Sequence, residues 1–137
     1  RGVFIEDCKL DSPELDHALR FKNNAIRGGV LEDIHARRIT VGQVRQAVIT
    51  IDFNYEEGAR GAFKPVLRHM TVETLISGKS RYAVNLQGLA ANSEISDILL
   101  SDCEFNAVAE PAIVKNVDRL MLQRVTVNGT PVDRLTA

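Results

Sequence analysis

The segment ILLSDCEF (residues 98–105) has apolar side chains at its first, third, sixth and eighth positions. Spacing of two within each pair is typical of a strand with one buried face. Four other segments share this template: VFIEDCKL (3–10), IHARRITV (34–41), MTVETLIS (70–77) and LMLQRVTV (120–127). Only the third departs from it, with Ser77 in the last slot.

The copies recur at intervals of roughly 22 to 36 residues, and a constant core template with variable spacing is typical of a solenoid with insertions in its loops. Each interval also holds a second alternating apolar stretch: ALRFK (18–22), AVITIDF (47–53), AVNLQ (83–87) and AIVKN (112–116). The pattern predicts an all-β fold, a right-handed parallel β-helix of about five coils in one partial domain, 1–137. A leucine-rich repeat would show a more uniform leucine pattern, and a β-sandwich stays the competing all-β prediction.

Hairpin signals are scarce in the sequence. The Asn-Gly pair of VNGTP (127–131) follows the last expected strand, so we expect it to close no hairpin. Cys8 and Cys103 occupy the same column of the repeat, three coils apart. At about 4.8 Å per coil they would lie roughly 14 Å apart, beyond disulfide reach, so we expect two core thiols.

Composition excludes several partner classes. The 137 residues are 45% hydrophobic and 26% charged with a formal net charge of −1, which gives no basic excess for nucleic acid. No apolar run reaches the roughly 18 residues of a membrane span, and no signal peptide is apparent. None of the three histidines has a partner at metal-ligand spacing, so the sequence predicts no metal and no cofactor. The chain opens on RGVFIEDC, already strand-like, as expected for part of a longer domain.

The run ALRFKNNAIRGGVLEDIHARRITV (18–41) resembles the part of glycoside hydrolase family 28, the polygalacturonases and relatives, that carries the Arg-Ile-Lys motif. The motif reads Arg20-Phe21-Lys22 here, followed by Arg27-Gly28-Gly29. AVITIDFNYEEG (47–58) is similar to the family segment that ends in a substrate-contacting tyrosine, here Tyr55, and YAVNLQGL (82–89) to the coil that follows. The likeness covers nearly the whole chain, 3–129.

The resemblance implies hydrolysis, with inversion, of α-linked galacturonic acid polymers (pectin) by a secreted or periplasmic parent protein. The family's Asn-Thr-Asp, Asp-Asp and Gly-His-Gly motifs are missing between residues 1 and 20. Inversion needs two carboxyl groups roughly 6.5–9.5 Å apart, and none stands at the matching positions. We therefore expect no catalytic residue in this chain, an inactive fragment, and a role in holding acidic polysaccharide.

Arg20 and Lys22 alternate with Leu19 and Phe21, which sends both cations to one face of a strand. Alone, the pair is most simply read as solvated charge. With the resemblance we predict a substrate clamp, because Arg donates two parallel hydrogen bonds to a carboxylate and Lys adds a compact charge. Tyr55 would stack on a sugar or cover the core edge, and Arg27 would meet a second uronate or simply face solvent.

Other polar residues are weaker candidates. His17 is expected in a turn rather than in direct contact with substrate. The acidic cluster of Asp11, Glu14 and Asp16 has the composition of an exposed turn rather than of a catalytic pair. Asn85 and Gln87 share the column of Arg20 and Lys22 two coils on, as an extended polar groove or a solvated face. The sequon at Asn128 is followed by Pro131 and is a poor glycosylation candidate.

Two further functions stay open. The chain would be a non-catalytic module that binds acidic polysaccharide, or a structural β-helix segment whose exposed N-terminal coil self-associates, because an uncapped solenoid exposes strand edges and core.

Overall fold

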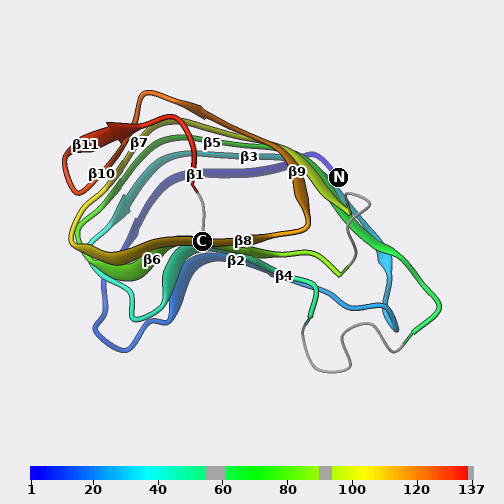
Figure 1. The fold of residues 1–137 in the computed structure, drawn as a ribbon. Coiled ribbons are helices and arrows are strands. Elements are labelled where there is room, and N and C mark those ends of the chain that lie inside the picture. The colour runs from blue at the N-terminus through cyan, green and yellow to red at the C-terminus, as the bar shows by residue number, and fades with distance from the viewer. Residues whose placement is uncertain (55–60, 90–93, 136–137) are drawn as a thin grey trace.

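The computed structural model describes residues 1–54, 61–89 and 94–135. Their regular secondary structure is all β-strand, arranged in two sheets. Sheet A, the upper layer in Figure 1, holds β1 (Val3–Leu10), β3 (Gly29–Val41), β5 (Pro65–Ser77), β7 (Ile95–Phe105), β9 (Val117–Gln123), β10 (Val125–Val127) and β11 (Thr130–Val132). Sheet B, the lower layer, holds β2 (His17–Lys22), β4 (Ala47–Asp52), β6 (Ser80–Gln87) and β8 (Val108–Lys115).

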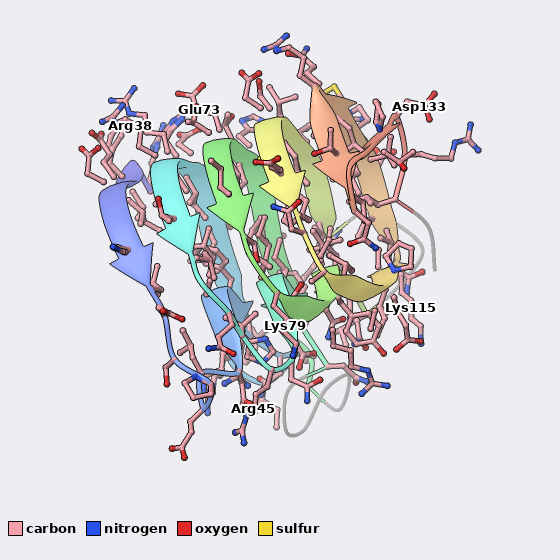
Figure 2. All side chains as sticks on the ribbon, turned by 90° about the vertical axis from the view of Figure 1, so that its left-hand side faces the viewer. Arg38, Arg45, Glu73, Lys79, Lys115 and Asp133 are labelled. Carbon is pink, nitrogen blue, oxygen red and sulfur yellow. The ribbon has the colours of Figure 1, made fainter. Side chains whose placement is uncertain are left out.

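The chain alternates between the sheets, so one sheet A strand and the following sheet B strand form one circuit. Each strand pairs in parallel with its counterpart in the next circuit, in the orders β1-β3-β5-β7 and β2-β4-β6-β8. Figure 2, turned by 90°, shows the sheet A strands side by side in chain order. The predicted all-β fold with parallel strands is confirmed.

The repeat template matches the observed register. Ile34 stands beside Met70, Met70 beside Ile98 and Ile98 beside Leu120. The second column aligns from Ala36 to Leu122, the third from Ile39 to Cys103 and the fourth from Val41 to Val127. These columns point between the sheets and form one core with the inward residues of sheet B. Ser77 keeps its slot in that core, although its hydroxyl is buried without a hydrogen-bond partner among the described residues.

The gap in the middle of the template has a backbone cause. In every copy, the second of the two central residues has a left-handed conformation, with φ between 52° and 57°: Asp7, Arg38, Thr74, Asp102 and Arg124. Non-glycine residues rarely adopt a positive φ, and one such residue shifts the alternation of side chains by one position. Ala36 and Ile39 can therefore both face the core, while Arg37 and Arg38 between them lie at the surface.

A second column of left-handed residues runs five positions earlier, through Asp33, His69, Asp97 and Arg119. The two columns bend each long strand twice at matching places, so the bends stack along sheet A. Along this second column, His69 lies 3.7 Å from Asp33 and 3.5 Å from Asp97, which also pairs with Arg119.

The Asn-Gly pair does close a hairpin, so that expectation was wrong. Asn128 and Gly129 both have positive φ and connect β10 to the antiparallel β11. This is the turn chemistry that a tight hairpin needs, and the last strand of the template ends exactly where the turn begins. The hairpin was not predicted because residues 130–132 are too short a segment to be recognised as a strand.

The two cysteines lie in one column, as predicted. Cys8 stands beside Ile39, Ile39 beside Leu75 and Leu75 beside Cys103, and both thiols are free. Cys103 is buried, whereas Cys8, in the first circuit, is only partly buried. Burial raises the pKa of the Cys103 thiol to about 12.

The ends of the stack differ. At the β1 and β2 end, Phe4 is 62% exposed and a hollow of about 520 Å³ opens onto Ile5, Cys8, Leu19 and Phe21. At the other end, β11 covers the edge of β10, and Leu135 is buried in the core. The described residues contain no helix long and apolar enough to cross a membrane.

Candidate functional site

The outer face of sheet B carries two rows of mainly polar side chains. Strand register aligns Arg20, Thr50, Asn85 and Ile113 in one row and Lys22, Asp52, Gln87 and Lys115 in the other. Asn85 and Gln87 therefore lie in the columns of Arg20 and Lys22, as predicted. We call these eight residues the sheet B rows.

Arg20 and Lys22 are exposed, while Leu19 is 6% exposed and Phe21 is partly buried. The predicted segregation of the cations to one face of β2 is confirmed. Parallel pairing with β4 holds this edge strand on one side, and the apolar side chains anchor it to the core. The strand therefore orients both cations outward at little further cost in conformational entropy.

Hydrogen bonds order the polar groups in and next to the sheet B rows. The Gln87 amide donates to the Asn85 side-chain oxygen at 2.9 Å, and the Thr50 hydroxyl lies 2.7 Å from Nδ1 of His17. His17 is the first residue of β2 and not a turn residue, so that expectation was wrong. Its burial, with a smaller contribution from the charge of Arg20, lowers its pKa, which favours a neutral ring at pH 7.

The sheet B rows hold three cations and a single carboxylate, Asp52. Its Oδ1 accepts a hydrogen bond from the backbone of Asn54 at 2.9 Å. Because an inverting hydrolase needs two carboxyl groups across the scissile bond, these eight residues can bind an anion but supply no acid–base pair. The sequence argument did not single out Thr50, Asp52 or Lys115, although the alternation in AVITIDF and AIVKN would have placed them beside the chosen residues.

Arg27 lies on the turn that follows β2, and it is exposed. Two buried asparagines organise this turn: the Asn23 amide donates to the Gly28 carbonyl at 2.7 Å, and the Asn24 side-chain oxygen accepts from the backbone of Arg27 at 2.9 Å. Gly28 has positive φ, and a Cβ there would lie 2.6 Å from Cβ of Phe63, so the turn admits only glycine at this position. The asparagines are the residues that position Arg27, and the NN pair was their only sequence signal.

The remaining candidate residues lie in the turn before β2 or outside the described residues. Tyr55 lies outside the described residues. Asp16 pairs with Arg45 at 2.8 Å, and Asp11 and Glu14 are exposed in the turn before β2, as expected for that acidic cluster. In the part of the chain that the structure describes, no three His, Cys, Asp or Glu side chains gather in a way that could hold a metal ion.

Comparison with known proteins adds no relative. No protein-family model, no curated protein and no solved structure matches this chain. The candidate site therefore stands on its own residues and geometry, and the resemblance to glycoside hydrolase family 28 stays a hypothesis.

Proposed function

We propose that this chain is part of a right-handed parallel β-helix that binds acidic polysaccharide, polygalacturonate or a related pectin, along the outer face of sheet B. The observation that carries the proposal is the pair of exposed cations, Arg20 and Lys22, on one face of a strand. Alternation of the chain between two parallel sheets supports the β-helix. Parallel strands of one sheet are connected with right-handed crossovers in about 98% of cases, which supports the hand.

A uronate polymer fits this face by chemistry. The guanidinium of Arg20 matches a carboxylate with two parallel hydrogen bonds, and Lys22 contributes a second positive charge. Asn85 and Gln87, both partly exposed, offer hydrogen-bonding groups for sugar hydroxyls along the direction in which the circuits stack, whereas the Thr50 hydroxyl is buried and contacts His17. Lys115 places a further cation at the far end of its row.

As part of a polygalacturonase-like enzyme, the face would hold the substrate while carboxyl groups from outside this chain hydrolyse it with inversion. Such polymers lie outside cells, so the proposed parent protein is secreted or periplasmic. The sheet B rows lack a carboxylate pair, and the proposal therefore expects binding without hydrolysis from these 137 residues.

Calorimetry with oligogalacturonate tests the binding. The unmodified chain should bind saturably, and Arg20→Ala and Lys22→Ala should each weaken binding about tenfold or more, the loss typical of one charge-assisted hydrogen bond. Lys64→Ala removes an exposed cation outside the rows and is the matched control. Equal affinity of all four proteins would remove the clamp.

A reducing-sugar assay on polygalacturonate distinguishes a chain that only holds the substrate from one that also hydrolyses it. No turnover is expected from this chain at concentrations at which it binds. Rapid turnover would show that the carboxyl groups needed for hydrolysis are present, and would overturn the assignment of a holding role.

A second candidate role is self-association through the β1 and β2 end. The exposed Phe4, the unpaired edges of both strands in the described chain and the open hollow beside Cys8 favour it. Light scattering should show a mass that rises with concentration and falls in Phe4→Ser. A monomer at every concentration would exclude this role.

A further inference from the structure

A second hollow, of about 380 Å³, lies on the turns that lead from sheet A into sheet B. Its lining comes from consecutive circuits and includes Arg45, Lys79, Ser80 and Arg81. Figure 2 shows Arg45 and Lys79 on successive turns of the side that faces the viewer. Arg20 and Lys22 do not line it, so this hollow is distinct from the sheet B rows.

Two arginines of the hollow are oriented by acids. Nε of Arg45 donates to Asp16 at 2.8 Å, and Nε of Arg81 donates to Glu110 at 3.0 Å. The Arg81 guanidinium also lies over the ring of Tyr82, 5.0 Å from its centroid. Both ion pairs use Nε, so the terminal nitrogens of each fork retain donors for another acceptor.

Lys79 gives the hollow a net positive charge. Asp16 and Glu110 offset the two arginines, and neither acid lines the hollow. The ammonium group of Lys79 has no ion pair or hydrogen bond with any described residue, and the side chain is exposed. One cationic donor of the three is therefore uncompensated by protein.

Ser80 is the observation that points to a ligand. The residue is only 4% exposed and lines the hollow, and its buried hydroxyl has no hydrogen-bond partner among the described residues. Buried hydroxyl groups are normally paired, because an unpaired one forfeits its hydration without replacement. An acceptor oxygen in the hollow would satisfy it.

We propose that this hollow binds a small oxyanion, a carboxylate or a phosphate-like group. The anion accepts hydrogen bonds from Lys79 and the Ser80 hydroxyl, and from the terminal nitrogens of Arg45 and Arg81. This site does not depend on the function proposed above, because it shares no residue with the sheet B rows.

Titrations followed by the amide resonances of residues 79–81 test the site. Inorganic phosphate and sodium galacturonate are the two anionic probes, and uncharged galactose is the control for the sugar ring. Saturable shifts with at least one anion, and none with galactose, are expected. Stronger binding of phosphate assigns the natural ligand to phosphate-like groups, and stronger binding of galacturonate assigns it to uronates.

Variants separate a built site from general charge attraction. Lys79→Gln should weaken binding of the better anion about tenfold, and Ser80→Ala about three- to tenfold, the loss of one hydrogen bond. Lys64→Gln removes the same charge from the surface outside the hollow and should leave the affinity unchanged. Absence of saturable shifts with both anions, or an equal loss in Lys79→Gln and Lys64→Gln, would overturn the proposal.

Discussion

The outer faces of the two sheets carry charge in different arrangements. On sheet A, cations and acids from neighbouring circuits pair with each other: Arg37 with Glu6, Arg38 with Asp7, Arg68 with Glu32, Arg119 with Asp97 and Arg124 with Asp102. On sheet B, the rows hold three cations and one carboxylate. The described sheet A strands also bend at left-handed residues, which the described sheet B strands lack, so the two faces differ in backbone course as well as in side chains.

Ion pairing within each sheet bears on where a charged ligand would bind. Opposite charges in register on adjacent strands stabilise a sheet, and the five arginines of sheet A named above each have an acidic counterpart. The cations of the sheet B rows outnumber the carboxylate of those rows three to one. The excess of cations within these rows is the reason for proposing anion binding on the face of sheet B.

The largest loss of stability is expected from changes in the core that both sheets share. Phe53, the residue after β4, and Phe105, the last residue of β7, are both fully buried in the common core. Replacing either by Ala should cost about 3–5 kcal/mol of unfolding free energy. Chemical denaturation measures both, with the exposed Ile76→Ala as the control at about 0.5 kcal/mol or less. A large loss in only one phenylalanine variant would mean that the sheets do not share one core.

The next prediction compares the removal of two cations from sheet A with the removal of two cations from sheet B. Arg38→Ala combined with Arg124→Ala removes cations of sheet A, and it should lower the stability while leaving the affinity for oligogalacturonate unchanged. Arg20→Ala combined with Lys22→Ala should leave the stability unchanged and lower the affinity for oligogalacturonate, by about 100-fold if the two donors act independently. Calorimetry and thermal unfolding on the same samples check both. If the sheet A variant also lost affinity, the faces would not differ in function.

Thiol labelling compares the accessibility of Cys8 and Cys103, the two cysteines of one core column. Because the pKa of Cys103 is about 12, its thiol stays protonated at pH 8, and it is buried as well. Cys8, in the first circuit and half-buried, should react with a maleimide first. Mass spectrometry after mild labelling should find the modification on Cys8 and little on Cys103. Equal labelling of both would mean that the stack opens readily.

Acid should weaken the ion pairs of sheet A. Hydrogen bonds from Arg38, Arg119 and Arg124 lower the pKa values of Asp7, Asp97 and Asp102 below 3.8. A lowered carboxyl pKa contributes stability above the unfolded value, and that contribution is lost as the pH falls below about 3.8 toward the folded value. All three carboxylates are at the surface, so the effect is small and salt should reduce it further.

Thermal unfolding from pH 6 to pH 2 measures the acid effect. Asp102→Asn should flatten the profile, because the amide does not titrate. An unaltered profile in that variant would show that the pair with Arg124 does not contribute to the acid response.

The smallest expected effect is on His17, beside the sheet B rows. Its lowered pKa means that protonation favours the unfolded chain, so stability decreases as the pH falls below the ordinary value of 6.5. Arg20→Ala removes one cause of the shift and should raise the pKa of His17 slightly. An NMR titration of the ring measures this. A lower pKa in the variant would contradict the placement of Arg20 near the imidazole.

Much of this architecture was readable in the sequence because the core repeats. The template columns fixed the register, and the register placed Asn85 and Gln87 beside Arg20 and Lys22. The left-handed bends were not readable, because Arg and Thr rarely adopt this conformation, and Asp, although enriched in it, is also common elsewhere. The hairpin at Asn128 was missed although its turn residues are diagnostic, since the strand after it is only three residues long. The contact between His17 and Thr50 depends on tertiary packing across two strands.

The stacked bends have a consequence for how this fold can change in length. Each circuit meets its neighbours through the same backbone course, so gain or loss of an entire circuit would leave a matching surface on either side. A deletion of one residue between Ala36 and Ile39 would instead remove the bend at Arg38, so β3 would no longer follow the course of β1 and β5 on either side of it. Length variation in this molecule should therefore come in whole circuits or in its turns, and almost never as single residues inside the long strands.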